Sequence, residues 1–234
     1  MARITRKELK TDKFALEVEH TVDFFDEHKQ EILRYGAAAL VVVLIVVAIM
    51  IYRNHQHQVR EQALSQALQI LEAPTGPNAA AAGLSFPTVE ARTQEAAKRF
   101  SELAAKYPGT TEGEMAEFTL ASMDVDAGRL SDAEKRLKEL AASGDKKYAS
   151  LAKLSLSQIY FSTGRVVQGE EILRPLIDKP TIFVSKDEAI IALARGIART
   201  KPAEARKLLE PLRASRSSAV SQAAIQLYSE IQQQ

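Results

Sequence analysis

Histidine and acidic side chains are the groups in this chain whose chemistry could include metal binding or proton transfer. Cysteine is absent, which excludes disulfides, thiolate nucleophiles, cysteine-ligated metals and a lipobox. No histidine has a second ligand at the spacing with which a helix holds a metal ion. The four histidines are His20, His28, His55 and His57. Asp124 and Asp126 would lie on different faces of a helix, so we expect both to be solvated surface residues.

The motifs of common enzyme classes are also missing from the sequence. There is no glycine-rich loop that could cradle a phosphate and no nucleophile elbow. We therefore predict a protein that is not an enzyme and that has no catalytic residues, cofactor or metal site. Residues 53–234 hold 24 Lys and Arg against 22 Asp and Glu, a balance that gives no electrostatic footprint for nucleic acid.

A long uncharged segment runs from Gly36 to Tyr52, with the sequence GAAALVVVLIVVAIMIY. At a helical rise of ~1.5 Å per residue it would span roughly 25 Å, near the lower limit for crossing a bilayer core. Flanking arginine and tyrosine side chains suit the headgroup layer. We predict a transmembrane helix over residues 35–53 that meets lipid through residues 36–52. The alternative is a buried core helix of a soluble protein, which seldom carries Val and Ile on every face.

The residues around this segment argue against a cleaved signal peptide. Thirty-five residues precede the segment, several of them acidic, and the following Tyr52-Arg53-Asn54-His55 offers no cleavage site. The tail carries seven Lys and Arg, and the positive-inside rule therefore favours a cytoplasmic amino terminus. We predict a permanent single span, with residues 1–34 as a cytoplasmic tail that contains an amphipathic helix.

Beyond the apolar segment the chain has the spacing of helices. No stretch alternates apolar and polar residues for long enough to indicate a sheet. Residues 56–71 read as a helix that continues from the membrane. Proline, glycine and alanine then interrupt the pattern, so we predict a flexible insertion at residues 73–87. The sequence thus predicts an all-α fold whose main domain covers residues 54–234.

A period of thirty-six residues organises this domain. The motif Leu137-Lys138-Glu139-Leu140 recurs as Leu173-Arg174-Pro175-Leu176 and as Leu209-Glu210-Pro211-Leu212. Small residues keep the same register at Ala133, Gly169 and Ala205. Such a period, with two helices per unit, is typical of a helical solenoid. The two prolines at one repeat position indicate either an accommodated bend or helices that stop there.

These units resemble the tetratricopeptide repeat (TPR). The residues that fit its pattern best are Leu156, Ser157, Tyr160, Gly164, Gly169, Leu173 and Leu176. Asp124 and Gly196 replace the aromatic residue in the neighbouring units. The resemblance implies about three to four degenerate repeats, and residues 219–231 would form the closing helix that solenoids need.

The first helices of such repeats line a concave surface that can take an apolar or helical segment of another protein. The period places these candidates there: Met115, Phe118, Ser122, Leu151, Leu154, Gln158, Phe161, Ile190 and Ala194. A second candidate surface is the tail helix, which could bind a partner or lie on the membrane. Its shared face consists of Phe14, Val18, Val22 and Phe25.

The order of the parts carries a second resemblance. A tail with Val22-Asp23-Phe24-Phe25-Asp26-Glu27-His28, a single span, His-Gln pairs after the span and degenerate repeats resembles the YfgM-like family of ancillary SecYEG translocon subunits. The resemblance implies a single-pass protein of the bacterial inner membrane with its repeats in the periplasm. Its partners would be translocon subunits, a membrane-anchored periplasmic chaperone and exported client proteins. The insertion at residues 73–87 and the basic start at residues 3–13 depart from that family.

Two other functions fit the same architecture. The repeats could organise cell-wall or division complexes in the envelope. With inverted topology they would instead form a cytoplasm-facing TPR adaptor.

Overall fold

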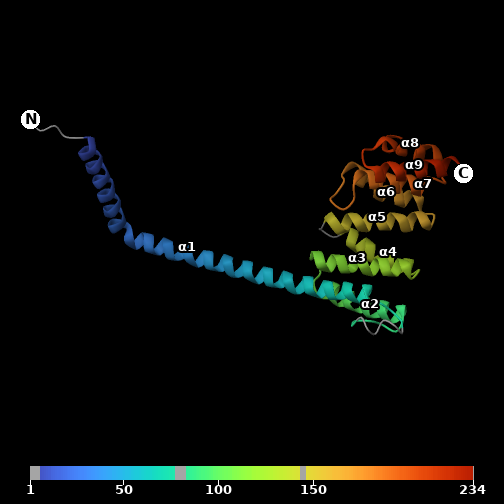
Figure 1. The fold of residues 1–234 in the computed structure, drawn as a ribbon, viewed down its shortest axis with the longest axis horizontal. Helices are drawn as coiled ribbons and strands as arrows, with labels where there is room; N and C mark the ends of the chain where they lie inside the picture. Colours follow the sequence, from blue (N-terminus) through green and yellow to red (C-terminus); the bar gives the residue numbers. More distant parts are fainter. Residues whose placement is uncertain (1–5, 77–82, 143–145, 234) are drawn as a thin grey trace, which may run out of the picture. The chain divides into compact units, whose positions relative to one another are not determined.

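The computed structural model describes residues 6–76, 83–142 and 146–233, and it confirms the all-α prediction for them. The helices are α1 (Arg6–Glu72), α2 (Val89–Lys106), α3 (Thr111–Asp126), α4 (Leu130–Ala141), α5 (Lys146–Ser162), α6 (Val166–Asp178), α7 (Lys186–Ile197), α8 (Pro202–Leu209), the 3₁₀ helix η2 (Glu210–Ala214) and α9 (Ser218–Gln232) (Figure 1). The chain divides into an amino-terminal part, residues 1–58, and a compact repeat domain, residues 59–234.

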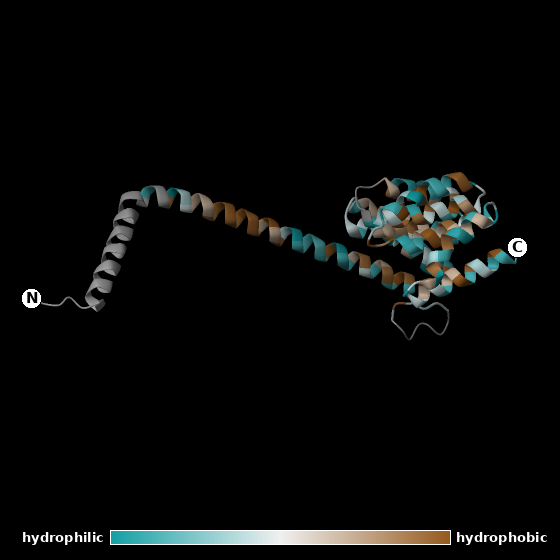
Figure 2. Cartoon of the chain, turned by 90° about the horizontal axis from the view of Figure 1, so that it is seen from above, coloured by the Kyte–Doolittle hydropathy of each residue, from teal (hydrophilic) through white to brown (hydrophobic). Residues whose placement is uncertain are grey.

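In the amino-terminal part, α1 contains a helical segment that is long and apolar enough to span a membrane. This apolar segment appears as the brown stretch of α1 in Figure 2. Its large side chains are about half exposed or more, as at Leu40 and Ile51, so they form no protein core. Helix α1 runs from Arg6 to Glu72 and therefore includes the residues of the predicted tail helix and of the predicted span. The side chains of Phe14, Val18, Val22 and Phe25 lie outside the described part of the structure.

The repeat domain begins with the last turns of α1, which pack against α2 and α3. Ala67 and Ile70 of α1 share a core cluster with Phe100 and Leu103 of α2. Arg60 also donates a hydrogen bond of 2.9 Å from Nε to Glu112 of α3. This helix therefore serves as the first helix of the first pair.

The following helices form a TPR-like solenoid, as predicted. Each helix from α2 to α8 packs against the next one, and the first helices also meet one another in the pairs α3–α5, α5–α7 and α7–α9. Leu137, Leu173 and Leu209, which share one register position, are all buried. Periodic burial follows from helix geometry, since apolar residues three and four positions apart lie on one face.

The two prolines at one repeat position have different surroundings. Helix α6 continues through Pro175 and ends at Asp178. Helix α8 instead ends at Leu209, and Pro211 lies in the tighter η2. The sequence left open whether the helices continue through these prolines or stop there. The helix continues at Pro175 and stops before Pro211.

The predicted insertion at residues 73–87 lies partly outside the described residues, namely at 77–82. Its described ends are joined by backbone hydrogen bonds, with Gly76 donating to Phe86 at 3.0 Å and Phe86 donating to Pro74 at 3.1 Å. Arg92 of α2 donates a further hydrogen bond of 3.1 Å to the carbonyl of Ala73. The insertion therefore leaves and rejoins the repeat domain at neighbouring points.

Ion pairs with the same thirty-six-residue period join successive units. Glu134 of α4 pairs with Arg165 at 2.6 Å, and Glu170 of α6 pairs with Lys201 at 2.6 Å. Each acid also pairs with a base one turn later on its own helix, at Lys138 and Arg174. The buried edge of each junction is thus closed by a carboxylate that two cations share.

At the preceding junction the buried Ala96 and Phe100 correspond to Ala133 and Leu137, so Ala97 occupies the position of the acid and this pairing is not possible. Arg129 instead pairs with Asp124 at 2.6 Å, and Arg136 donates to the same carboxylate at 3.1 Å. The prediction that Asp124 is a solvated surface residue was therefore wrong, because two arginines hold it in a buried position. In the next unit Tyr160 stands at the repeat position of Asp124, and the Arg165 guanidinium lies 4.3 Å from the centre of its ring.

The pairing at Glu134 makes stability depend on pH. Hydrogen bonds from Arg165 and then from Lys138 lower the pKa of Glu134 from its ordinary value of 4.5 to about 2. A lowered folded-state pKa stabilises the fold above the ordinary value, and the stabilisation is lost as the pH falls toward the folded-state value. Glu134→Gln should therefore destabilise the domain at neutral pH by about 1 to 2 kcal/mol, because solvent screens part of the interaction.

Urea unfolding of the detergent-solubilised chain at several pH values checks this expectation. The difference between the two proteins should shrink as the pH falls from 4.5 toward 2. Glu139→Gln is the matched control, since Glu139 is exposed on the same helix and has no ion pair among the described residues. An equal loss of stability at pH 7 and pH 2 would contradict the assignment.

Candidate protein-binding groove

Two adjoining cavities lie along the first helices of the repeats. The larger, of about 690 Å³, is bounded by α5, α7 and α9. The smaller, of about 380 Å³, lies between α3, α4 and α5. Gln158 of α5 lines both, so we treat them together as the groove. We call them the larger and the smaller cavity.

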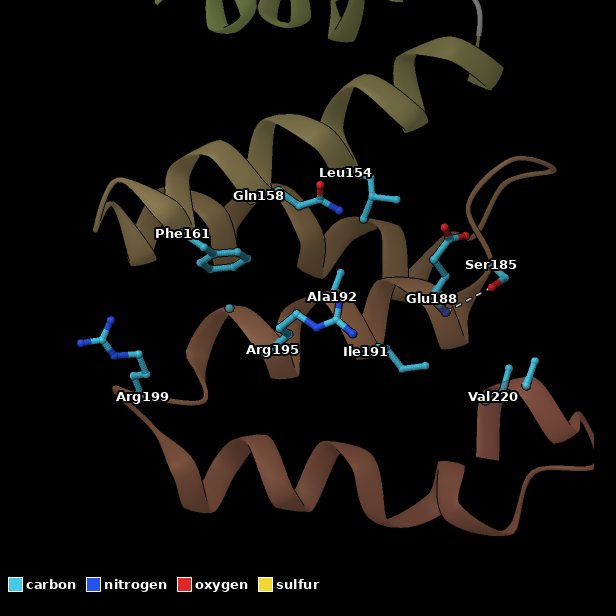
Figure 3. Close-up of a pocket in the computed structure, with 12 residues that line it drawn as sticks. Leu154, Gln158, Phe161, Ser185, Glu188, Ile191, Ala192, Arg195, Arg199 and Val220 are labelled. Atoms are coloured by element: carbon cyan, nitrogen blue, oxygen red, sulfur yellow. Dashed lines mark hydrogen bonds between the residues drawn. The ribbon is translucent and has the colours of Figure 1, made fainter. Parts of the chain in front are cut away.

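Helix α5 supplies one wall of the larger cavity. Leu154, Gln158 and Phe161 are spaced by four and three residues and therefore share one face of the helix (Figure 3). All three were predicted to lie on the concave surface. Ser122, another predicted residue, lines the smaller cavity.

The other predicted residues lie in the packing beside the groove. Met115, Phe118 and Leu151 are partly buried against the core cluster that α3 shares with α4 and α5. Ile190 and Ala194 are buried in the core cluster of the carboxyl-terminal helices, together with Leu227 of α9. No binding role of these residues follows from their position alone.

The thirty-six-residue period predicts one face of α7 for the concave surface, but the larger cavity is lined by a different face of this helix. Its lining residues on α7 are Glu188, Ile191, Ala192, Arg195 and Gly196, and Arg199 in the turn after the helix also lines the cavity. Helix α9 packs against α7 and contributes Ala219 and Val220 to the cavity. Ile190 and Ala194, the residues of α7 equivalent to Leu154 and Gln158, are consequently buried. The alternation of Ile191 with Arg195 and Arg199 at helical spacing is the sequence signal that could have identified this face.

Phe161 is held between two glycines at the edge of the larger cavity. A Cβ atom on Gly169 would lie only 2.6 Å from Cε1 of the ring, and one on Gly196 would meet the opposite edge of the same ring. Gly196 occupies the repeat position of Tyr160, where an aromatic residue fits the TPR pattern. The departure at Gly196 therefore has a steric reason, which is to leave room for Phe161.

The larger cavity is mostly apolar, with charged side chains at both ends and Arg195 between them. Leu154, Phe161, Ile191 and Val220 provide aliphatic and aromatic surface. Figure 3 shows Glu188 beside Ser185 at one end and Arg199 at the other. Within the described residues there is no group of three or more His, Asp or Glu side chains that could share a metal ion. Such a lining suits the side chains of another polypeptide.

The contact between Phe161 and Gly196 can be tested by a double-mutant cycle. Gly196→Ala should destabilise the domain by about 1 to 3 kcal/mol, because the added methyl group overlaps the ring. In a Phe161→Ala background the same change should be neutral or stabilising, since alanine favours the helix by up to about 1 kcal/mol. Urea unfolding measures both. Destabilisation of equal size in the two backgrounds would exclude the contact.

Comparison with known proteins places these features in context. A family model described as "Tetratricopeptide repeat-like domain" matches residues 23–180. This match begins before the apolar segment of α1 and ends after α6. No curated protein matches the sequence.

Two crystal structures of similar fold contain nearly identical TPR-like repeats of a kinesin-light-chain-type protein from Podosopora anserina. They have TM-scores of 0.55 and 0.54, and both are 15% identical to this chain. Each covers 74% of this chain, which in turn covers 84% and 85% of theirs. At this identity the likeness concerns the fold alone.

Proposed function

The chain belongs to the tetratricopeptide repeat-like domain family, and from this premise we propose that it is a membrane-anchored scaffold that holds other polypeptides in its groove. The observation that carries the proposal is the pair of adjoining cavities on the first helices. Their walls are apolar, and they open on the face that solenoids use for binding. Repeat domains of this kind serve as protein-interaction scaffolds.

Membrane anchoring is supported by the exposed apolar segment of α1. Leu40, Val43 and Ile49 each expose about half of their surface or more, and contiguous apolar surface of this extent is rare on a water-soluble protein. The family match also includes this segment, which links the anchor to the repeats. The basic tail favours an amino terminus in the cytoplasm and a repeat domain outside it.

The more specific proposal is an ancillary subunit of the SecYEG translocon in the bacterial inner membrane. It rests on the resemblance of the tail, the span and the degenerate repeats to the YfgM-like family. In this role the groove would hold segments of newly exported proteins or of a periplasmic chaperone, and the tail helix would meet the translocon.

Anchoring can be tested by placing charges within the apolar segment. Val42→Arg combined with Val46→Arg should release the protein during alkaline carbonate extraction, because each arginine costs about 2.5 to 3.5 kcal/mol at the centre of a spanning helix. The matched control changes Gln58 and Gln62 to arginine, on exposed positions of α1 beyond the segment. Release of the unaltered chain would refute the anchor. A reporter fused after Gln234 then gives the orientation.

Protein binding can be tested with a photo-crosslinking amino acid in intact membranes. At Gln158, which is exposed and lines both cavities, it should form adducts with exported proteins or a chaperone. At Lys207, which is exposed on α8 and lines neither cavity, it should form few. Adducts with cell-wall or division enzymes would favour the envelope scaffold instead. Equal labelling from both positions would reject a binding role for the groove.

A further inference from the structure

The larger cavity carries two arginines whose charges are not balanced within the described structure. Arg195 lies in the last turn of α7 and Arg199 lies in the turn just beyond the end of this helix; both are exposed and line the cavity. Neither forms an ion pair with a described carboxylate. The arginines at the junctions between units are different, since Arg129 and Arg165 each bind an acid at 2.6 Å.

We propose that the larger cavity binds an amphipathic helical segment of a partner, with acidic side chains at the carboxyl end of that segment against Arg195 and Arg199. The proposal rests on the function proposed above and specifies the chemistry of what the groove holds. Unpaired guanidinium groups beside an apolar surface favour a ligand that combines carboxylates with apolar side chains.

The dimensions of the cavity suit a short helix. From Glu188 to its last residue, Ile197, α7 advances nine residues, which corresponds to about 14 Å, or two and a half helical turns, and Arg199 lies just beyond. A ligand helix of that length presents three or four apolar side chains on one face. The apolar lining of the cavity, which includes Leu154, Ile191 and Val220, can receive them.

The two charged ends define the direction of the ligand. Glu188 at one end favours the partly positive amino terminus of a helix, and Arg199 at the other end favours its partly negative carboxyl terminus, with Arg195 between them (Figure 3). Acidic side chains near the carboxyl end add to this preference. The bound segment therefore runs in the same direction as α7.

Three synthetic peptides that share one apolar stripe can test the proposed preference for acidic side chains at the carboxyl end of the ligand. They carry two glutamates in the last turn, two glutamates in the first turn, or glutamines in both places. Fluorescence anisotropy with the full chain in detergent micelles should give the tightest binding for the first peptide. This preference should weaken at high salt, because exposed ion pairs are screened. Equal affinity for all three, or preference for the second, would overturn the proposal.

Charge reversal in the protein provides the matched comparison. Arg195→Glu with Arg199→Glu should weaken binding of the first peptide about tenfold. The same variant should bind a peptide with two lysines in the last turn more tightly, which shows that its groove is intact. Lys135→Glu with Lys207→Glu makes the same change in net charge on exposed positions of α4 and α8, and it should leave binding unchanged. Equal losses in both variants would contradict a local role for the arginines.

The outcome separates this inference from the proposed function. Crosslinking from Gln158 without any charge preference among the peptides would leave the scaffold in place and reject the acidic-helix rule. Failure of both crosslinking and peptide binding would reject the two together.

Discussion

Each helix pair of the repeat domain must bury one apolar face against the next pair, and the remainder of the domain depends on this constraint. Leu137, Leu173 and Leu209 are buried at one register position, and three adjoining core clusters extend from the end of α1 to α9. Because no pair can cover its own face, the stack needs a closing helix. Helix α9 meets that need, and in doing so it becomes a wall of the larger cavity.

The ion pairs between units show how one repeat position can serve different purposes. Glu134 and Glu170 join their units to the next, whereas Ala97 at the equivalent position cannot. Asp124 then takes over the pairing of Arg129. Basic residues at these junctions are consequently neutralised by their neighbours, while Arg195 and Arg199 in the larger cavity are available to a ligand.

The apolar segment and the repeat domain are connected within the chain by a single helix. The exposed apolar segment of α1 and the first helix of the repeat domain belong to one continuous helix.

Several features of this protein follow from the sequence alone. Helical spacing, the thirty-six-residue period and the apolar segment of α1 are visible there, because they depend on the regular geometry of a single helix and on local composition. The same regularity located Leu154, Gln158 and Phe161 on the wall of the groove.

Other features were decided by tertiary contacts. The burial of Asp124 depends on two arginines, the fit of Phe161 on glycines in two other helices, and the covered face of α7 on α9. Sequence periodicity treats all units as equal, but the units differ in what packs against them. Whether a side chain faces solvent, the core or a ligand therefore depends on the neighbouring helix.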